Sequence, residues 1–63
     1  MKLTIEIIFE EGICVSNLAN EVRVCLNKIG NKIEDEYTGA PIELQFNGNH
    51  PGTYGAFTLT GGE

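Results

Sequence analysis

The chain has 63 residues, 41% of them hydrophobic and 21% charged, and its nine acidic and four basic residues give a net charge of −5. This length allows one small domain, residues 1–63, with the composition of a folded globular chain. The negative charge disfavours direct contact with nucleic acid or anionic membranes, because both present phosphates that an acidic surface repels. It suits a basic protein partner, although it also serves simply to keep a small protein in solution.

The two cysteines offer little prospect of a cross-link or a metal site. If Cys14 and Cys25 lay on one helix, their Cα atoms would be about 16 Å apart, whereas a disulfide spans at most about 7 Å. Together with His50, they lack the close paired spacing of zinc ligands. Free thiols are typical of a reducing compartment, and neither a signal peptide nor a membrane-spanning apolar run is visible, so we expect a cytoplasmic protein. We expect no metal or other cofactor. A domain this small is marginally stable alone, so we expect a homodimer.

The first predicted element is a strand at residues 2–9. Its apolar residues alternate, which places Leu3, Ile5, Ile7 and Phe9 on one face. Ile8 interrupts the otherwise polar outer face. It is either an isolated exposed residue or a contact between subunits.

The next element is a helix at residues 16–30, with Ser16 or Asn17 as its N-cap and Gly30 just past its end. The spacing of about 100° per residue predicts one buried face. That face comprises Leu18, Val22, Cys25, Leu26 and Ile29.

The opposite side of this helix has few charges. Asn20, Val24 and Asn27 form a mostly uncharged ridge, where a solvated helix more often carries Glu and Lys. The ridge is either an interface for a second subunit or target, or a chance result in an Asn-rich sequence.

Residues 31–40 are predicted to form a polar connector. It holds the densest charge cluster of the chain, Glu34, Asp35 and Glu36. Three adjacent acids could meet a basic patch on another protein, but acids in loops are more often simply solvated.

Two further strands, residues 42–46 and 56–60, are predicted to form a hairpin, with Phe57 and Leu59 facing inward. The nine-residue connection between them, residues 47–55, is far longer than the two residues that a hairpin needs. It contains Asn47, Asn49, His50 and Tyr54, and is either a binding loop or a wide turn. Residues 61–63 are predicted to be a frayed tail.

The order strand, helix, strand, strand predicts an α+β domain of two layers, β-α-β-β, in which one helix covers one face of a three-stranded, mainly antiparallel sheet. The sequence does not determine which strand neighbours the first. It has one histidine and no nucleophile motif or phosphate-binding loop, so we expect no enzymatic activity.

The favoured function is a small, acidic, non-catalytic inhibitor that docks, as a homodimer, on the basic site of a larger protein. In size, charge and Asn content the chain resembles the accessory proteins that phages encode to block bacterial defence systems. The candidate partner-binding residues are Glu34, Asp35, Glu36, Asn47, Asn49, His50 and Tyr54, and the candidate interface residues are Ile8, Asn20, Val24 and Asn27. Two alternatives stay open: a dimer that binds a small ligand through residues 47–55, and a structural or regulatory subunit of a larger complex.

Overall fold

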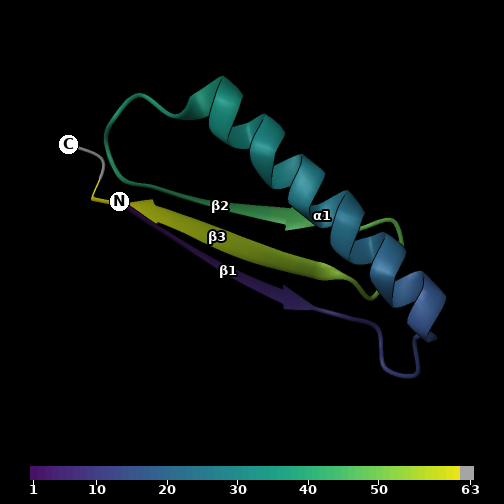
Figure 1. Ribbon diagram of the computed structural model, residues 1–63. Helices are drawn as coiled ribbons and strands as arrows, with labels where there is room; N and C mark the ends of the chain where they lie inside the picture. Colours follow the sequence, from purple (N-terminus) through teal and green to yellow (C-terminus); the bar gives the residue numbers. More distant parts are fainter. Residues whose placement is uncertain (62–63) are drawn as a thin grey trace.

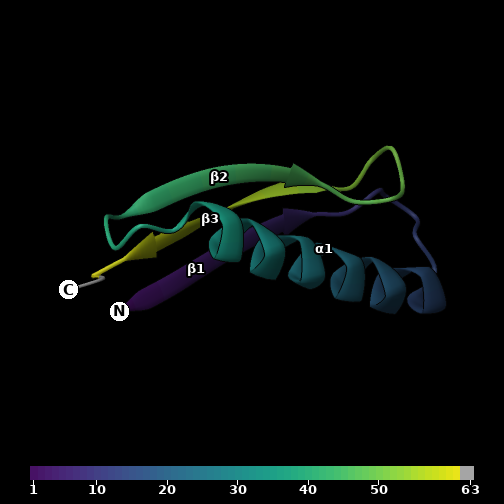
Figure 2. The ribbon, with the colours of Figure 1, turned by 90° about the horizontal axis from the view of Figure 1, so that it is seen from above.

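The computed structural model describes residues 1–61 and confirms the predicted architecture (Figure 1). Strand β1 spans Lys2–Ile8, helix α1 Val15–Glu36, strand β2 Ile42–Asn47 and strand β3 Tyr54–Thr60. The helix packs on one face of the sheet and leaves the other face uncovered, as the two views together show (Figures 1 and 2). Of the predicted tail at residues 61–63, residues 62 and 63 lie outside the described residues.

The sheet has the order β1-β3-β2, and both pairs are antiparallel. This settles the neighbour of β1, which the sequence left open: it is β3, the last strand. The register aligns apolar residues across all three strands, so that Phe57 has Ile5 on one side and Leu44 on the other. Because side chains alternate between the faces of a strand, this row faces the helix, and polar rows face away from it.

The core is small and lies between α1, β2 and β3. Cys25, Ile29, Phe46 and Phe57 are buried in one cluster, and Leu59 is buried as well. The inward orientation predicted for Phe57 and Leu59 is therefore confirmed. The helix lies over β2 more than over β1 (Figure 1), so the helix-facing side of β1 is less well covered.

Helix α1 is longer than predicted at both ends. It starts at Val15 with Cys14 as its N-cap, which makes no side-chain capping bond, so the N-cap prediction at Ser16 or Asn17 was wrong. Gly30 lies inside the helix instead of ending it. The helix continues for six more residues, and the backbone N–H of Tyr37 donates to the carbonyl oxygen of Ile33 at its end. The chain then turns at Gly39, whose φ of +100° suits glycine.

This extension corrects the reading of residues 31–40 as a connector. Asn31 to Glu36 are helical, so the acids Glu34, Asp35 and Glu36 occupy the last turn of α1. Their side chains are exposed, as a surface cluster requires.

The buried face of α1 is rotated from the predicted one. Glu21 is fully buried, and Leu26, which was predicted to be inside, is 48% exposed. Leu18 and Val22 are half-buried. The buried stripe of the helix is thus centred on Glu21, Cys25 and Ile29. The apolar residues of the helix extend beyond this stripe on one side, where Leu26 is exposed.

Three strand boundaries also differ from prediction, and the first is the end of β2, which lies at Asn47, one residue later than predicted. Strand β1 ends at Ile8, one residue before Phe9, and β3 begins at Tyr54, two residues earlier than predicted. The connection between β2 and β3 therefore shortens to residues 48–53. Ile8 is 42% exposed, as expected for the outer face of β1. No helix within residues 1–61 is both long enough and apolar enough to cross a membrane.

Candidate partner-binding site

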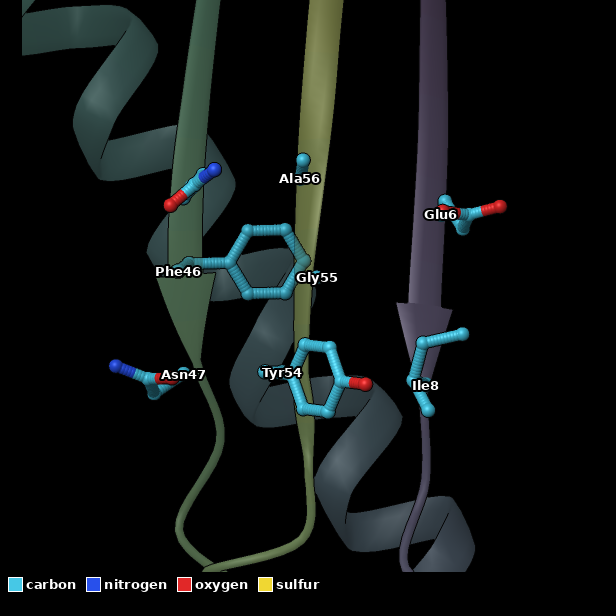
Figure 3. A pocket seen from close by; sticks show the side chains of 8 residues that line it. Glu6, Ile8, Phe46, Asn47, Tyr54, Gly55 and Ala56 are labelled. Atoms are coloured by element: carbon cyan, nitrogen blue, oxygen red, sulfur yellow. The ribbon is translucent and has the colours of Figure 1, made fainter.

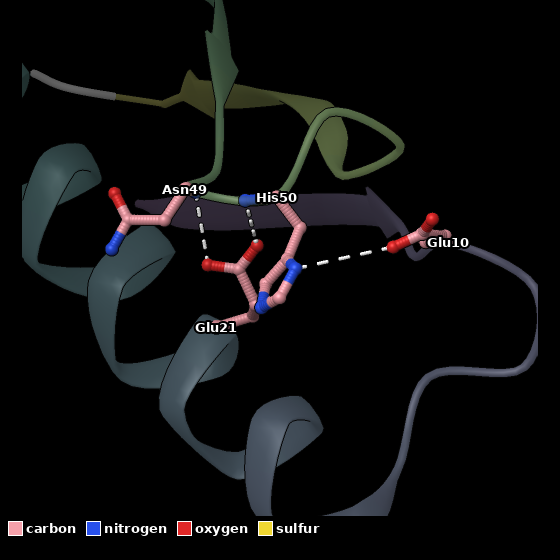
Figure 4. Close-up of polar contacts among 4 residues, drawn as sticks. All are labelled: Glu10, Glu21, Asn49 and His50. Atoms are coloured by element: carbon pink, nitrogen blue, oxygen red, sulfur yellow. Dashed lines mark hydrogen bonds and ion pairs between the residues drawn. The ribbon is translucent and has the colours of Figure 1, made fainter.

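The connection between β2 and β3 is held by a buried carboxylate from the helix (Figure 4). The Glu21 carboxylate accepts hydrogen bonds from the backbone N–H of Asn49, at 3.0 Å, and from that of His50, at 2.7 Å. Buried carboxylates need such partners, because an unsatisfied charge in the interior is costly. Glu21 therefore joins the helix to the loop.

These hydrogen bonds set the ionisation of Glu21. Burial alone would raise the pKa of this carboxyl, but the N–H groups of His50 and Asn49 favour the charged form and bring the pKa below its ordinary value. The buried Thr53 hydroxyl also lowers this pKa, although it meets hydrogen-bond geometry with no residue in the described part of the chain. Glu21 is thus ionised at neutral pH.

The rest of the loop is closed by its own backbone. The N–H of Gly48 donates to the carbonyl oxygen of Thr53, and the N–H of Thr53 donates to that of His50. Gly48 is required here, because a Cβ at this position would lie 2.7 Å from the Thr53 methyl carbon and 2.8 Å from the Glu21 carboxylate. The loop is thus a packed turn.

Two further contacts tie the same end of the molecule together. The Lys28 ammonium donates to the carbonyl oxygen of Asn47 at 2.6 Å. His50 Nδ1 lies 3.9 Å from a Glu10 carboxylate oxygen, and both side chains are partly exposed (Figure 4). Such an exposed pair stabilises the fold only slightly.

The uncovered face of the sheet carries a shallow hollow of about 480 Å³ near the same end (Figure 3). The register explains it, because Ala56 on β3 stands between Glu6 on β1 and Gln45 on β2. The small Ala56 side chain forms a floor between longer neighbours. The residues that line the hollow are Glu6, Ile8, Gln45, Phe46, Asn47, Tyr54, Gly55 and Ala56.

The hollow combines negative charge, polar acceptors and apolar surface. Glu6 supplies a carboxylate, and the side-chain amides of Gln45 and Asn47 supply oxygen acceptors. Tyr54 and Ile8, 53% and 42% exposed, provide an aromatic ring and an aliphatic wall. An arginine or lysine side chain matches this set, since its cation pairs with a carboxylate and attracts an aromatic face while its stem packs on apolar atoms.

The structure places the predicted partner-binding residues at three separate locations. Asn47 and Tyr54 line the hollow. Asn49 and His50 bond through their backbone to Glu21, on the helix side of the sheet. Glu34, Asp35 and Glu36 lie about 20 Å further along α1 than Glu21, at the opposite end of the helix (Figure 1). They therefore do not form one site.

Sequence reasoning missed Glu6 and Gln45 as members of the site. Both stood at outward positions of alternating strands, but only the strand order showed that they flank Ala56. Of the predicted interface residues, Ile8 lines the hollow, whereas the ridge of Asn20, Val24 and Asn27 lies on the helix.

Among residues 1–61, no group of three or more His, Cys, Asp or Glu residues is arranged to hold a metal ion. Cys14 is exposed and Cys25 is buried, and both are free thiols. The sequence matches no protein-family model, and searches of curated proteins and solved structures find no match either.

Proposed function

We propose that this protein is a small, non-catalytic inhibitor that docks on a basic site of a larger protein. The observation that carries this proposal is the hollow on the uncovered face of the sheet, where Glu6, Gln45, Asn47 and Tyr54 surround a small apolar floor. An arginine or lysine of the partner would insert here, with its cation at Glu6 and its stem against Ile8 and Tyr54.

The charge of the chain supports a basic partner. A net charge of −5 on 63 residues attracts a positively charged surface over about 8 Å, the screening length at physiological salt. Basic grooves that normally hold nucleic-acid phosphates are suitable targets, because they present arginines and lysines in a row. Inhibition would follow from occupying such a groove. The class resemblance to phage inhibitors of bacterial defence systems agrees with this mode of action.

The test starts from the partner that co-purifies with the tagged chain from its native host. Once that partner is identified, binding of the purified pair is measured by calorimetry for the wild type, Glu6→Lys and Tyr54→Ala. We expect each substitution to weaken binding at least tenfold, because the first repels the incoming cation and the second removes the aromatic wall. Binding should also weaken as salt is raised. The activity of the partner, measured with saturating wild-type chain, tests inhibition directly.

Glu34→Lys is the matched control, since it makes the same charge change at the far end of α1. If Glu34→Lys binds the partner with wild-type affinity while Glu6→Lys binds it more weakly, the result supports the hollow as the binding site. The reverse result would move the binding site to the acids at the end of the helix and overturn the assignment to the hollow.

The loop of residues 48–53 gives less support to the alternative of small-ligand binding. Two of its amides, those of Asn49 and His50, already donate to Glu21, and those of Gly48 and Thr53 close the turn. These N–H groups are therefore occupied within the chain.

A further inference from the structure

Apart from Met1 at the start of the chain, the exposed large apolar residues among residues 1–61 fall into two groups. Ile8 and Tyr54 border the hollow on the uncovered face of the sheet. Leu3, Val15 and Leu26, which are 44%, 81% and 48% exposed, belong to the side of the molecule that carries the helix. The second group is not explained by the core or by the hollow.

Leu26 and Val15 belong to a regular apolar series along α1. Residues 15, 19, 22, 26, 29 and 33 are separated by alternating steps of four and three, which is the spacing of the two core positions of a coiled-coil heptad. We call this series the α1 seam: Val15, Ala19, Val22, Leu26, Ile29 and Ile33. It is apolar at every position over about 27 Å of helix.

The seam is not the stripe with which α1 packs on its own sheet. That stripe is centred on Glu21, Cys25 and Ile29, and Ile29 is the one fully buried residue that belongs both to this stripe and to the seam. Val15, Ala19 and Leu26 are exposed, while Val22 and Ile33 are half-buried. The helix thus presents a second apolar stripe that its own sheet does not cover.

The direction of the seam follows from Lys28. Its ammonium reaches the carbonyl oxygen of Asn47 at the end of β2, so this side of the helix faces β2. Leu26 lies about 160° from Lys28 around the helix axis and therefore points the opposite way, toward the β1 side. Leu3, on the helix-facing side of β1, is exposed too, and the register places it level with Leu59 and Ile42, toward the end of the helix.

The charges around the seam suit a second copy of this acidic chain. On its solvent side, the seam is flanked by Ser16, Arg23 and Gly30, and a carboxylate follows only past the last seam residue, where Glu34 lies in line with Ser16. The exposed acids of the helix, Glu34, Asp35 and Glu36, are confined to its last turn. Two chains that each carry a charge of −5 repel one another wherever their acids meet, so an interface between them needs such an acid-free surface.

Gly30 adds an independent indication. A glycine in the middle of a helix weakens it, and a Cβ at Gly30 would meet nothing within 4 Å in this chain. Its small size therefore serves no contact inside the monomer. Beside the seam, it would allow a second helix to approach closely.

We infer that the α1 seam is the interface of a homodimer, in which the seams of two copies pack against each other around a two-fold axis. A two-fold interface brings the same surface from both copies together, and an apolar, acid-free stripe is compatible with itself. A standard interface buries about 800 Å² on each partner, roughly a fifth of the 4335 Å² surface of this chain. The covered region would include the seam and Leu3. The seam and the hollow lie on opposite faces of the sheet, so this inference stands apart from the proposed function.

Sedimentation velocity over a micromolar concentration series tests the inference. The wild type should sediment with twice the 6.9 kDa mass of one chain. Leu26→Glu and Val15→Glu should each shift the protein to the monomer, raising the dissociation constant at least tenfold. Val15 is 81% exposed at the start of the helix, so its substitution disrupts no core contact. Circular dichroism checks that each variant is folded.

Two variants separate this interface from other dimers. Asn27→Glu places the same charge on the ridge of Asn20, Val24 and Asn27, and Ile8→Glu places it on the uncovered face of the sheet. Both should remain dimeric. A monomeric wild type would overturn the inference, as would a dimer that dissociates with Asn27→Glu or Ile8→Glu but survives Leu26→Glu and Val15→Glu.

Discussion

At the scale of single residues, Glu21 determines how the helix and the loop fit together. Its carboxylate receives two backbone N–H groups, is fully buried, and lies against Gly48. The arrangement resembles a small anion-binding nest whose anion belongs to the protein itself. Glu21 therefore fixes the shape of the loop between β2 and β3. Asn47 and Tyr54, the strand residues next to this loop, line the hollow on the other face of the sheet.

This carboxylate makes stability dependent on pH in a defined direction. Because the pKa of Glu21 is lower in the folded state than in the unfolded chain, its contribution is complete above the ordinary carboxyl pKa of about 4.3. It is lost as the pH falls through the folded-state pKa. We expect Glu21→Gln to lower the melting temperature by several degrees at pH 7, and to have a smaller effect toward pH 3. Melting curves between about pH 3 and 7 measure this difference.

Glu43→Gln is the matched control for this titration, since Glu43 is exposed on the outer face of β2. It should melt close to the wild type across the series. A constant difference between Glu21→Gln and the wild type at every pH would contradict a role for the Glu21 charge.

At the scale of elements, the sequence predicted all four helices and strands and their order, but not the limits of the helix. Alternation identified the strands, because Phe57 and Leu59 repeat every second residue. Gly30 was read as a helix end, yet Ile29 and Ile33 both contact the sheet side and favour continuation past it. Local chemistry at one glycine could not show this packing.

The burial of Glu21 could not be predicted for a similar reason. Its partners are backbone groups of residues 49 and 50, and no side-chain pattern signals such a contact. The hollow also depended on strand order, which sets Glu6 beside Ala56 and Gln45. The sequence identified Asn47 and Tyr54 because they lie in a glycine-rich segment, a local signal that does not depend on distant partners.

The continuous helix makes a prediction about Gly30. Gly30→Ala should raise the free energy of unfolding by about 1 kcal/mol, since the added methyl group meets nothing within the chain. Urea unfolding in the Leu26→Glu background measures the effect without a contribution from association. Gly39→Ala should have the opposite sign, because the φ of +100° at Gly39 strains any residue with a Cβ. Equal effects of the two substitutions would contradict helical structure at Gly30.

At the scale of the whole molecule, this is a thin, elongated domain of 40 × 16 × 16 Å with one layer of helix and one of sheet. Within residues 1–61 only five apolar side chains are buried, and the outer face of the sheet has no cover. A core of this size supplies little stability to spare, in line with the few kcal/mol typical of domains below about 70 residues. Most of the surface is thus available for contacts with other chains.

The small core predicts that a single truncation at its centre unfolds the protein. Phe57 is 1% exposed and lies in the middle strand between Ile5 and Leu44, so its loss removes contacts with both neighbouring strands. Phe57→Ala should cost about 3–5 kcal/mol, which equals or exceeds the stability expected for the whole domain. We expect this variant to be mostly unfolded at 25 °C by circular dichroism. Tyr54→Ala, which removes an exposed aromatic ring from the same strand, should stay folded. A cooperative melt near the wild-type temperature for Phe57→Ala would show that the stability of the domain does not depend on this core.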